Sequence, residues 1–337
     1  MKKVGILTFT YGDNHGQRLQ NLAVQTILER LGFDAFTIPQ VKPRHYKIVN
    51  GVRHQNFEKF DDSFVKYYGD TIGKYKIPRG LSTFDYFIVG SDQVWSPYSS
   101  DVNWSFFLKF APSEKRISYA PSVASDDIPK KKEALYRWYL HGFKEISVRE
   151  SKTEKILRKY TNVPIQTLID PTLMFDSQFW NNYSLKPKFD LPKNYILYYS
   201  LGQKGENEEV IRFTEAMNMS LVSLQSGSDY FTSGPSEFLY LISNAAGVIT
   251  DSYHGTIFSI LYHKPVYFVP RNSNEINMQS RFDTLFDKLG VTLECGNQFP
   301  KRCIIDNEKT DVLLDGERKK TDEYLKRVLH INHAESK

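Results

Sequence analysis

The stretch Gly247–Pro270 has the pattern of a complete strand–helix–strand unit, and it constrains the fold more than any other part of the chain. A short apolar run is followed by the polar turn Thr250–Ser252, after which apolar residues recur at helical spacing. Lys264–Pro265 ends that helix before a second apolar run at Val266–Val269. Such units build a parallel sheet covered by helices, so the pattern predicts an α/β fold.

The turn of this unit carries four residues that suit a ligand site: Ser252, Tyr253, His254 and Gly255. They stand where the carboxyl end of a strand meets a helix N-terminus, and free backbone N–H groups and the helix dipole favour anions there. A histidine at this place can also transfer a proton near neutral pH. Two interpretations are open: an anion-binding and proton-transfer site, or an N-cap serine followed by a histidine on the helix surface. The rest of the chain favours the first.

The N-terminus predicts another unit of the same kind. Lys3–Thr10 has a buried-strand pattern, and the polar turn Tyr11–Gly16 follows it. A helix is expected from Gln17 to about Leu31, and Phe33–Pro39 is the next predicted strand. The glycine spacing of the turn is not that of a dinucleotide-binding loop. The turn is either a ligand loop, which presents amides and the Asn14 side chain, or a plain strand–helix connection.

Two further strands of the first half also end in polar loops. Phe84–Gly90 leads into a Gly-Ser-Asp turn, and Arg116–Ala120 leads into Pro121–Ser122. Parallel strands end at the same edge of a sheet, so these loops are candidates for lining a ligand site. The candidate residues are Ser91, Asp92, Gln93 and Ser122.

Arg149 stands at the carboxyl end of a short predicted strand, just before a helix predicted at Ser151–Tyr160. An arginine there can hold a carboxylate or a phosphate through two parallel hydrogen bonds. It can equally form a salt bridge with Glu150 or Glu154, so this residue alone leaves both interpretations open.

The pattern also predicts a division into domains. The last strand of the first half is predicted at Val163–Met174, with a turn at Asp170–Pro171. Composition then becomes polar and proline-bearing from Phe175 to Lys193, which is typical of a domain boundary. A second α/β series follows, and an amphipathic helix is predicted at Lys319–Ile331. The expected parts are a first domain at 1–185, a second at 186–318, and a C-terminal helix and tail at 319–337.

The segment Gln40–Gly80 differs from its surroundings. It is basic and aromatic, and its periodicity is weak apart from a short helix predicted near Asn56–Tyr67. The segment is either a solvated insertion or a flap that meets an anionic glycolipid or membrane face.

Composition limits the class of protein. A chain of 337 residues is long enough for two domains, and 40% hydrophobic with 25% charged residues is typical of a soluble globular protein. The net charge of +5 fits an anionic substrate or membrane face and is too small to indicate nucleic acid. The N-terminus lacks the features of a signal peptide, and no apolar run approaches a membrane span. Cys295 and Cys303 lack CxxC spacing, so we expect reduced thiols and a cytoplasmic protein.

Segments spread over most of the chain resemble the polysaccharide pyruvyl transferase family. They are GDNHGQRLQNLAV, VGSDQVWS, RISYAPS, SVRE, LIDPTL and TDSYHGTIFSILYHKPV, in that order. The resemblance implies an α/β fold similar to that of GT-B glycosyltransferases, in which two Rossmann-like domains face each other across a cleft and the C-terminal helix returns to the first domain. It also implies transfer of a pyruvyl group from phosphoenolpyruvate to two hydroxyls of a sugar, which leaves a cyclic ketal.

The resemblance also assigns residues by position. The family's arginine corresponds to Arg149, and its histidine corresponds to His254. Many members read Arg-Leu-His where this chain has Ser252, Tyr253 and His254, so one family arginine is missing. We hypothesise that Arg281 replaces it, since the first turn of a helix disfavours a cation unless an anion lies nearby. Our candidate donor- or anion-binding set is Ser252, Tyr253, Gly255, Thr256 and Arg281, and our candidate acceptor or cleft-lining set is Asn14, Gly16, Gln17, Ser91, Asp92, Gln93 and Ser122.

The implied reaction requires an acid. Phosphoenolpyruvate is unreactive at C2 until its methylene carbon is protonated, and His254 is the candidate general acid. Asp251, its neighbour in the sequence, would favour the protonated imidazole, and the helix N-terminus would oppose it. The sequence holds no HExxH and no clustered Asp-x-Asp motif, so we expect no metal and no cofactor, with phosphoenolpyruvate as the donor substrate.

The expected acceptor is a sugar or a lipid-linked oligosaccharide in polysaccharide biosynthesis, with peripheral contact to the inner membrane face. Two alternatives stay open. One is a GT-B glycosyltransferase that uses a sugar nucleotide, for which Asp283 and Asp287 are candidate contacts. The other is a non-catalytic glycan-binding relative.

Overall fold

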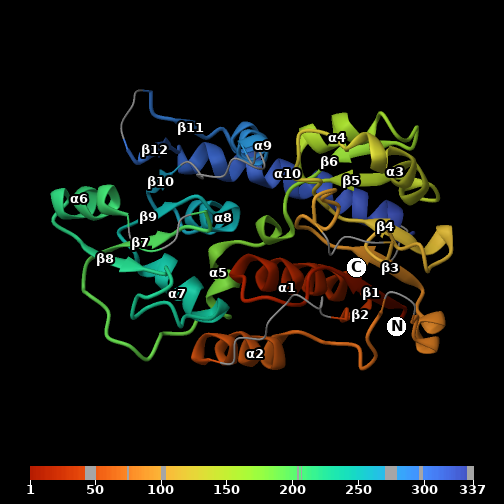
Figure 1. The fold of residues 1–337 in the computed structure, drawn as a ribbon, viewed down its shortest axis with the longest axis horizontal. Coiled ribbons are helices and arrows are strands. Elements are labelled where there is room, and N and C mark those ends of the chain that lie inside the picture. The colour runs from red at the N-terminus through yellow and green to blue at the C-terminus, as the bar shows by residue number, and fades with distance from the viewer. Residues whose placement is uncertain are drawn as a thin grey trace.

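The apolar runs of the sequence form two α/β units, which lie side by side along the long axis of the molecule (Figure 1). The computed structural model describes residues 1–41, 51–73, 76–99, 104–202, 205, 207–269, 279–295 and 299–331. Each unit is a largely parallel sheet with helices packed against it, so the predicted fold of two Rossmann-like domains is confirmed.

The first unit is built on a four-stranded parallel sheet in the order β2-β1-β3-β4, and a separate parallel pair, β5-β6, lies beside β4. Two serines join β4 to β5: Ser147 Oγ donates to Ser118 O at 2.7 Å, and Ser147 N donates to Ser118 Oγ at 2.9 Å. The strands are β1 (Lys3–Leu7), β2 (Asp34–Thr37), β3 (Tyr86–Val89), β4 (Arg116–Ser118), β5 (Ile146–Val148) and β6 (Ile165–Thr167), and the helices are α1 (His15–Arg30), α2 (Val52–Phe64), α3 (Glu133–Leu140), α4 (Ser151–Leu157) and α5 (Ser177–Asn181).

The second unit is a six-stranded sheet in the order β11-β12-β10-β9-β7-β8. Four of its strands are parallel, and β12 and β11 continue the sheet in antiparallel pairing. The sequence pattern did not predict these last two strands. The strands are β7 (Tyr195–Tyr199), β8 (Ser220–Ser223), β9 (Gly247–Thr250), β10 (Val266–Phe268), β11 (Thr292–Leu293) and β12 (Lys301–Ile304), and the helices are α6 (Glu208–Ala216), α7 (Pro235–Asn244), α8 (Tyr253–Leu261) and α9 (Gln279–Leu289).

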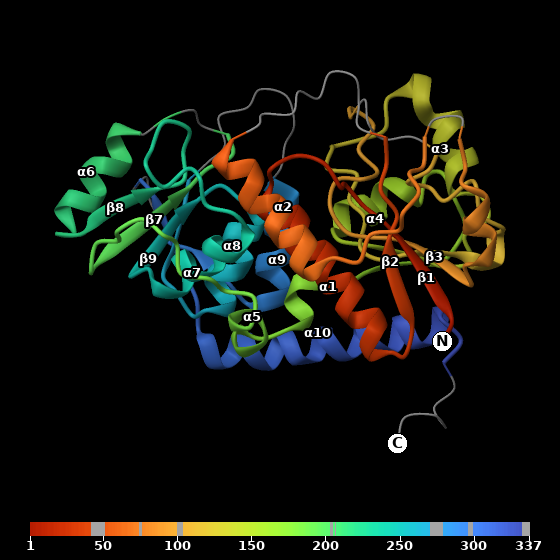
Figure 2. The ribbon, with the colours of Figure 1, turned by 90° about the horizontal axis from the view of Figure 1, so that it is seen from below.

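The C-terminal helix α10 spans Asn307–Val328, so it begins twelve residues earlier than the predicted start at Lys319. Gly316 and many charged residues weaken the helical pattern there, and packing rather than propensity stabilises this part. Figure 2 shows α10 running along both units. Its last turns contact the first unit, since Tyr324 Oη donates to Ser118 O at 2.8 Å. The predicted return of this helix to the first domain is therefore confirmed.

The helix α2 joins the two units, which corrects the interpretation of residues 52–64 as a solvated insertion. The interpretation of the segment as a flap that meets a glycolipid or membrane face stays a prediction. Arg53 Nη1 donates to Phe231 O at 2.6 Å, and Asn56 Nδ2 donates to Thr232 O at 2.9 Å. Both acceptors belong to the loop between β8 and α7, in the second unit. The basic and aromatic residues at 42–50 and 74–75 lie outside the described residues. None of the helices in the described ranges combines the length and the apolar composition of a transmembrane span.

His15, at the start of α1, completes this junction. Its side chain is fully buried, Nε2 lies 3.0 Å from Ser233 O, and Nδ1 lies 3.2 Å from Tyr199 Oη. A carbonyl only accepts, so Nε2 carries the proton, and Nδ1 accepts from the tyrosine hydroxyl. Burial, reinforced by the charge of Arg53, places the pKa of His15 well below its ordinary value of 6.5. The imidazole is therefore neutral in the folded protein.

Stability is expected to fall as the pH decreases below about 6.5. The unfolded chain binds a proton at His15 that the folded chain excludes, so this histidine stabilises the fold above that pH and the effect is lost below it. One such group gives a slope of at most about 1.4 kcal/mol per pH unit. Denaturant unfolding at pH 7.5 and 5.5 measures it. His15→Gln should reduce the difference in the free energy of unfolding between pH 7.5 and pH 5.5. An unchanged difference would contradict the assignment of this pH dependence to His15.

Candidate active site

Four strand ends meet at the junction of the two units. Ser91 follows β3, Arg149 follows β5, and Asp170 follows β6, whereas His254 stands in the first turn of α8 after β9. Arg149 Nη1 lies 3.0 Å from Asp170 Oδ2, and His254 Nε2 lies 3.5 Å from the same oxygen. The arginine and the histidine that the sequence singled out thus converge on one carboxylate, although they belong to different units.

Asp170 is the centre of this cluster, whereas the sequence predicts only a turn at this residue. Its side chain is fully buried, and Oδ2 accepts from Ser91 Oγ at 2.9 Å. Oδ1 accepts from the backbone N and the hydroxyl of Thr172 at 3.0 and 2.7 Å. This capping starts the 3-10 turn Pro171–Met174, so the strand predicted at Val163–Met174 ends early, at Thr167. An acidic residue directly after an apolar strand was the signal that could have identified it.

The carboxyl of Asp170 is ionised. Burial by itself raises the pKa of a carboxyl group, but attraction to His254 and to Arg149, with the hydrogen bonds from Thr172, outweighs burial. The pKa of Asp170 therefore lies well below its usual value. The cluster holds a fixed negative charge between a guanidinium and an imidazole.

Arg149 is enclosed by protein groups. Its Nε lies 3.0 Å from Glu150 Oε1, and its Cζ lies 4.4 Å from the centre of the Tyr253 ring. The salt bridge with Glu150 that the sequence left open is therefore present, together with the one to Asp170 that it did not predict. Burial lowers the pKa of Arg149, but the carboxylates of Glu150 and Asp170 outweigh it, so the pKa is raised and the charge is permanent. Among the described residues, its buried Nη2 has no hydrogen-bond partner.

His254 is only 8% exposed, because α8 is buried on all sides. The interpretation of a histidine on a helix surface is therefore wrong. The ring packs on the backbone of Gly16, where a Cβ atom would lie 2.1 Å from His254 Nδ1. Nε2 is buried and faces Asp170 at a distance beyond normal hydrogen-bond length, and it has no hydrogen-bond partner within the described ranges. This nitrogen can share a proton with the carboxylate or pass it to a bound molecule.

The start of α8 is less open to anions than the sequence implied. Ser252 Oγ accepts from Gly255 N at 3.2 Å, and Ser252 N donates to Thr250 Oγ1 at 2.9 Å. Two of the amides at positions 252–255 are thus bonded within the protein. Thr256 contributes a buried hydroxyl for which the described part of the chain provides no hydrogen-bond partner.

Two cationic side chains approach the Tyr253 ring. Arg281, in the first turn of α9, is 6% exposed, and its Cζ lies 5.7 Å from the centre of the ring that Arg149 also contacts.

Both carboxylate oxygens of Asp251 accept hydrogen bonds from the loop after β7. Asp170, rather than Asp251, is therefore the carboxylate that stands against the imidazole.

The residues predicted for the acceptor side have different places. Asn14 Oδ1 caps α1 by accepting from Gln17 N at 3.2 Å, and Asp92, at a φ of 84°, accepts from the backbone of Gln93 at 2.8 Å. These side chains shape their loops. Gln17 Oε1 and Ser122 Oγ are buried without hydrogen-bond partners in the described residues. Their assignment to the acceptor side stays a prediction. Ser91 joins the cluster itself, through Asp170 and Arg149.

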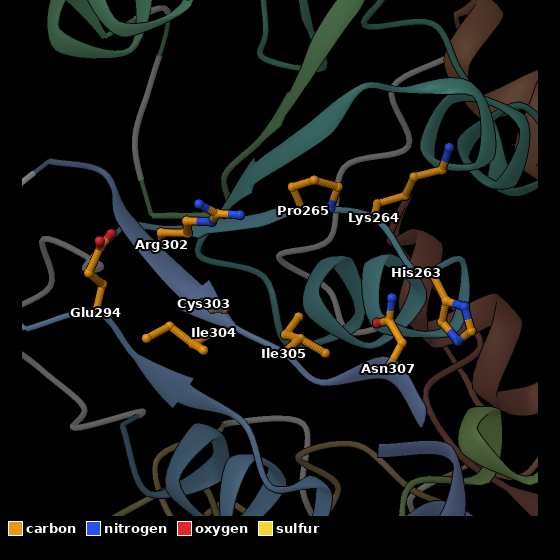
Figure 3. A pocket seen from close by; sticks show the side chains of 9 residues that line it. All are labelled: His263, Lys264, Pro265, Glu294, Arg302, Cys303, Ile304, Ile305 and Asn307. Atoms are coloured by element: carbon orange, nitrogen blue, oxygen red, sulfur yellow. The ribbon is translucent and has the colours of Figure 1, made fainter. Parts of the chain in front are cut away.

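A pocket of about 450 Å³ lies elsewhere in the second unit, where β10 begins and β12 ends (Figure 3). Its lining includes His263, Lys264 and Arg302, and none of the predicted site residues. The described residues also contain no group of three or more His, Cys, Asp or Glu side chains that could hold a metal ion.

Comparison with models of known protein families shows which family the chain belongs to. The model of a family described as polysaccharide pyruvyl transferase matches residues 14–273. The chain belongs to the polysaccharide pyruvyl transferase family. The match includes Gly16, Arg149, Asp170 and His254, whereas Arg281 lies beyond its end. A comparison with curated protein sequences finds no match.

Solved structures show which fold this pyruvyl transferase family member shares. The chain is similar to UDP-GlcNAc 2-epimerase from Methanocaldococcus jannaschii, with 12% identity, a TM-score of 0.53, and coverage of 98% of this chain and 100% of the other. It is also similar to a glycosyltransferase from Rickettsia africae, with 12% identity, a TM-score of 0.50, and coverage of 98% and 99%. At these identities the likeness concerns the fold, which is GT-B-like.

Gly16→Ala is expected to displace the imidazole of His254, because the new Cβ would overlap its ring. A displacement of about 1 Å typically costs about 100-fold in rate, and overpacking costs about 1–3 kcal/mol of stability. Steady-state kinetics and thermal unfolding measure both. Gly316→Ala is the matched control, since Gly316 also lies in a helix and its Cβ would meet open space. It should leave the rate unchanged, and an equal loss in both variants would contradict the contact.

Proposed function

We propose that this protein transfers a pyruvyl group from phosphoenolpyruvate to two hydroxyls of a sugar, forming a cyclic ketal and releasing phosphate. The observation that carries the proposal is the convergence of His254 and Arg149 on Asp170, in a chain that belongs to the pyruvyl transferase family. A proton donor, a permanent cation and a fixed anion are the groups that this reaction needs.

In the proposed reaction, His254 delivers a proton to the methylene carbon of phosphoenolpyruvate, which becomes a methyl group and leaves C2 electron-poor. A sugar hydroxyl attacks C2 and returns its proton to the imidazole. The bond from C2 to the phosphate oxygen breaks, and phosphate leaves with the electron pair. A second hydroxyl of the same sugar then closes the ring, and its proton passes to the departing phosphate or to water.

The surrounding groups support these steps. The ionised Asp170 faces the imidazole Nε2 at 3.5 Å and holds it opposite the guanidinium. Nη2 of Arg149, which has no hydrogen-bond partner in the described part of the chain, is the atom of that side chain left for the carboxylate or phosphate of the donor. Arg281 adds a second positive charge near the Tyr253 ring. Preorganised donors of this kind are each worth about 10²–10³ in rate.

Arg281→Ala is expected to raise the KM for phosphoenolpyruvate by about tenfold or more, since the donor loses one cation that offsets its charge. Initial rates over a range of donor concentrations measure the effect. Arg302→Ala, which removes an exposed arginine of β12, is the control and should leave KM unchanged. If Arg281→Ala kept normal donor affinity, Arg281 would not be the replacement for the missing family arginine.

Phosphate release tests the proposed function. Phosphoenolpyruvate should yield phosphate with at least one acceptor in a panel of galactosyl, glucosyl and mannosyl compounds, free and lipid-linked, and EDTA should not prevent it. Phosphoenolpyruvate should also raise the melting temperature, whereas UDP-sugars should not. Stabilisation by a UDP-sugar alone would favour a glycosyltransferase, and stabilisation by glycans without turnover would favour a binding protein.

A further inference from the structure

The outer face of α3 has an unusual set of exposed residues. Between positions 130 and 141, every exposed side chain is basic, apolar or histidine. Leu135 and Trp138, three residues apart on one face of the helix, are 40% and 52% exposed. Large apolar side chains that stand together in solvent indicate a contact surface. The exposed residues are Lys130, Lys131, Ala134, Leu135, Arg137, Trp138 and His141.

A neighbouring loop extends this surface. Lys132 Nζ donates to Pro97 O, which places the loop after β3 against the start of α3. The next residue, Tyr98, is 60% exposed. The same loop begins with Ser91 of the active-site cluster, so the exposed aromatic residue and the site are joined by one short segment. We call Tyr98, Leu135 and Trp138, with the lysines at 130 and 131, the α3 surface.

The charge of the α3 surface is positive. Lys130, Lys131, Arg137 and Lys144 are exposed, whereas Glu133, the acidic residue of α3, is half-buried. Asp126 and Asp127, in the loop before this segment, pair with Lys152 and Lys159. The exposed Glu114 lies near Arg116, whose Nη1 donates to His141 O. The indole of Trp138 is also held in place, because Lys109 Nζ lies 4.6 Å from its ring centre and donates to Trp138 O at 2.9 Å.

We propose that the α3 surface docks on a bilayer that contains anionic lipids. Tryptophan and tyrosine favour the interface between headgroups and acyl chains, and lysine and arginine beside them are attracted by anionic headgroups. Figures 1 and 2 both place α3 in the part of the first unit that lies away from the second sheet. Docking would place the protein at a membrane surface, whichever reaction the active site catalyses.

Sedimentation with lipid vesicles tests the docking. The full chain should bind vesicles of phosphatidylglycerol and phosphatidylcholine more tightly than vesicles of phosphatidylcholine alone, and added salt should weaken the binding. Lys130→Glu with Lys131→Glu should weaken it by at least about 25-fold, since each lysine near an anionic surface is worth about fivefold. Leu135→Ser with Trp138→Ser should weaken it by about tenfold or more, because less apolar surface is buried.

A matched control uses another exposed leucine with basic neighbours. Leu185 is 60% exposed and follows α5, and Lys186 and Lys188 are exposed beside it. Leu185→Ser with Lys186→Glu and Lys188→Glu should bind vesicles as the unchanged protein does. All variants should keep their melting temperature and their phosphate release with a water-soluble acceptor.

Three outcomes would overturn the proposal. They are an absence of binding to the anionic vesicles, binding that the α3 variants leave unchanged, and a dimer in solution that the α3 variants dissociate. The last result would assign the α3 surface to a second copy of the chain. Loss of phosphate release in every protein would instead count against the proposed function and leave the vesicle result valid.

Discussion

His254→Gln is expected to lower kcat for phosphate release by about 10²–10⁴-fold, because the reaction loses the group that protonates the methylene carbon. Glutamine is close to the imidazole in size and keeps a polar end, but it cannot donate a proton at neutral pH. Binding of phosphoenolpyruvate should persist, because the cationic groups remain. Steady-state kinetics gives the rate, and the donor-induced rise in melting temperature reports the binding.

His263→Gln is the matched control for this experiment. His263 follows the last turn of the same helix α8, but its side chain is 46% exposed and lies 3.2 Å from Asp311 Oδ2 on the protein surface. Its substitution should leave both kcat and stability unchanged. Full activity in His254→Gln would contradict the proposal that His254 is the general acid. An equal loss of kcat in both variants would instead indicate that either substitution disturbs the helix α8.

Asp170→Asn is expected to have the second largest effect, on both the rate and the fold. Asparagine keeps the shape of the side chain and removes the charge between Arg149 and His254. Breaking a buried ion pair by removing one partner typically costs about 3–5 kcal/mol, and Glu150, which stays on Arg149, should hold the cost near the lower value. Because the imidazole loses the carboxylate that orients it, kcat should fall by about 10²-fold or more.

The KM for phosphoenolpyruvate distinguishes a positioning role of Asp170 from a merely structural one. Removing a negative charge beside Arg149 leaves the guanidinium freer for an anionic donor, so KM should not rise while kcat falls. A loosened site would raise KM as well. Asp315→Asn is the control: this residue pairs with Arg318 at 2.9 Å on the exposed side of α10 and should affect neither constant. A rise in KM as large as the fall in kcat would contradict the positioning role.

The local sequence pattern was sufficient to predict the two strand–helix–strand segments that carry His254 and Gly16. The stretch around His254 folds as the strand β9, the helix α8 and the strand β10, with Ser252 as the N-cap. The N-terminal unit likewise follows its apolar periodicity, and α1 begins only two residues before the predicted start. In both places the alternation between apolar runs and polar turns is strong, and short-range hydrogen bonding fixes the outcome.

The predictions were wrong where packing outweighs local preference. The early start of α10 includes Gly316, and burial of Thr310 and Leu314 stabilises it there. The helix predicted near Asn56–Tyr67 forms at Val52–Phe64, but its weak periodicity did not predict that Phe57 and Phe60 are buried at the junction of the two units. Asp170 looks like a turn residue, because nothing in its neighbourhood along the chain shows what faces it.

The sequence by itself determined the α/β units, the family, and the position of a histidine and an arginine at strand ends. These properties depend on residues close together along the chain. Only the tertiary structure decided that Asp170 joins Arg149 to His254, and that Gly16 supports the imidazole. Those contacts join segments far apart in the sequence, so their distances depend on how the two sheets and the helices between them pack. The buried charge of Asp170 is stable only because this packing brings its partners next to it.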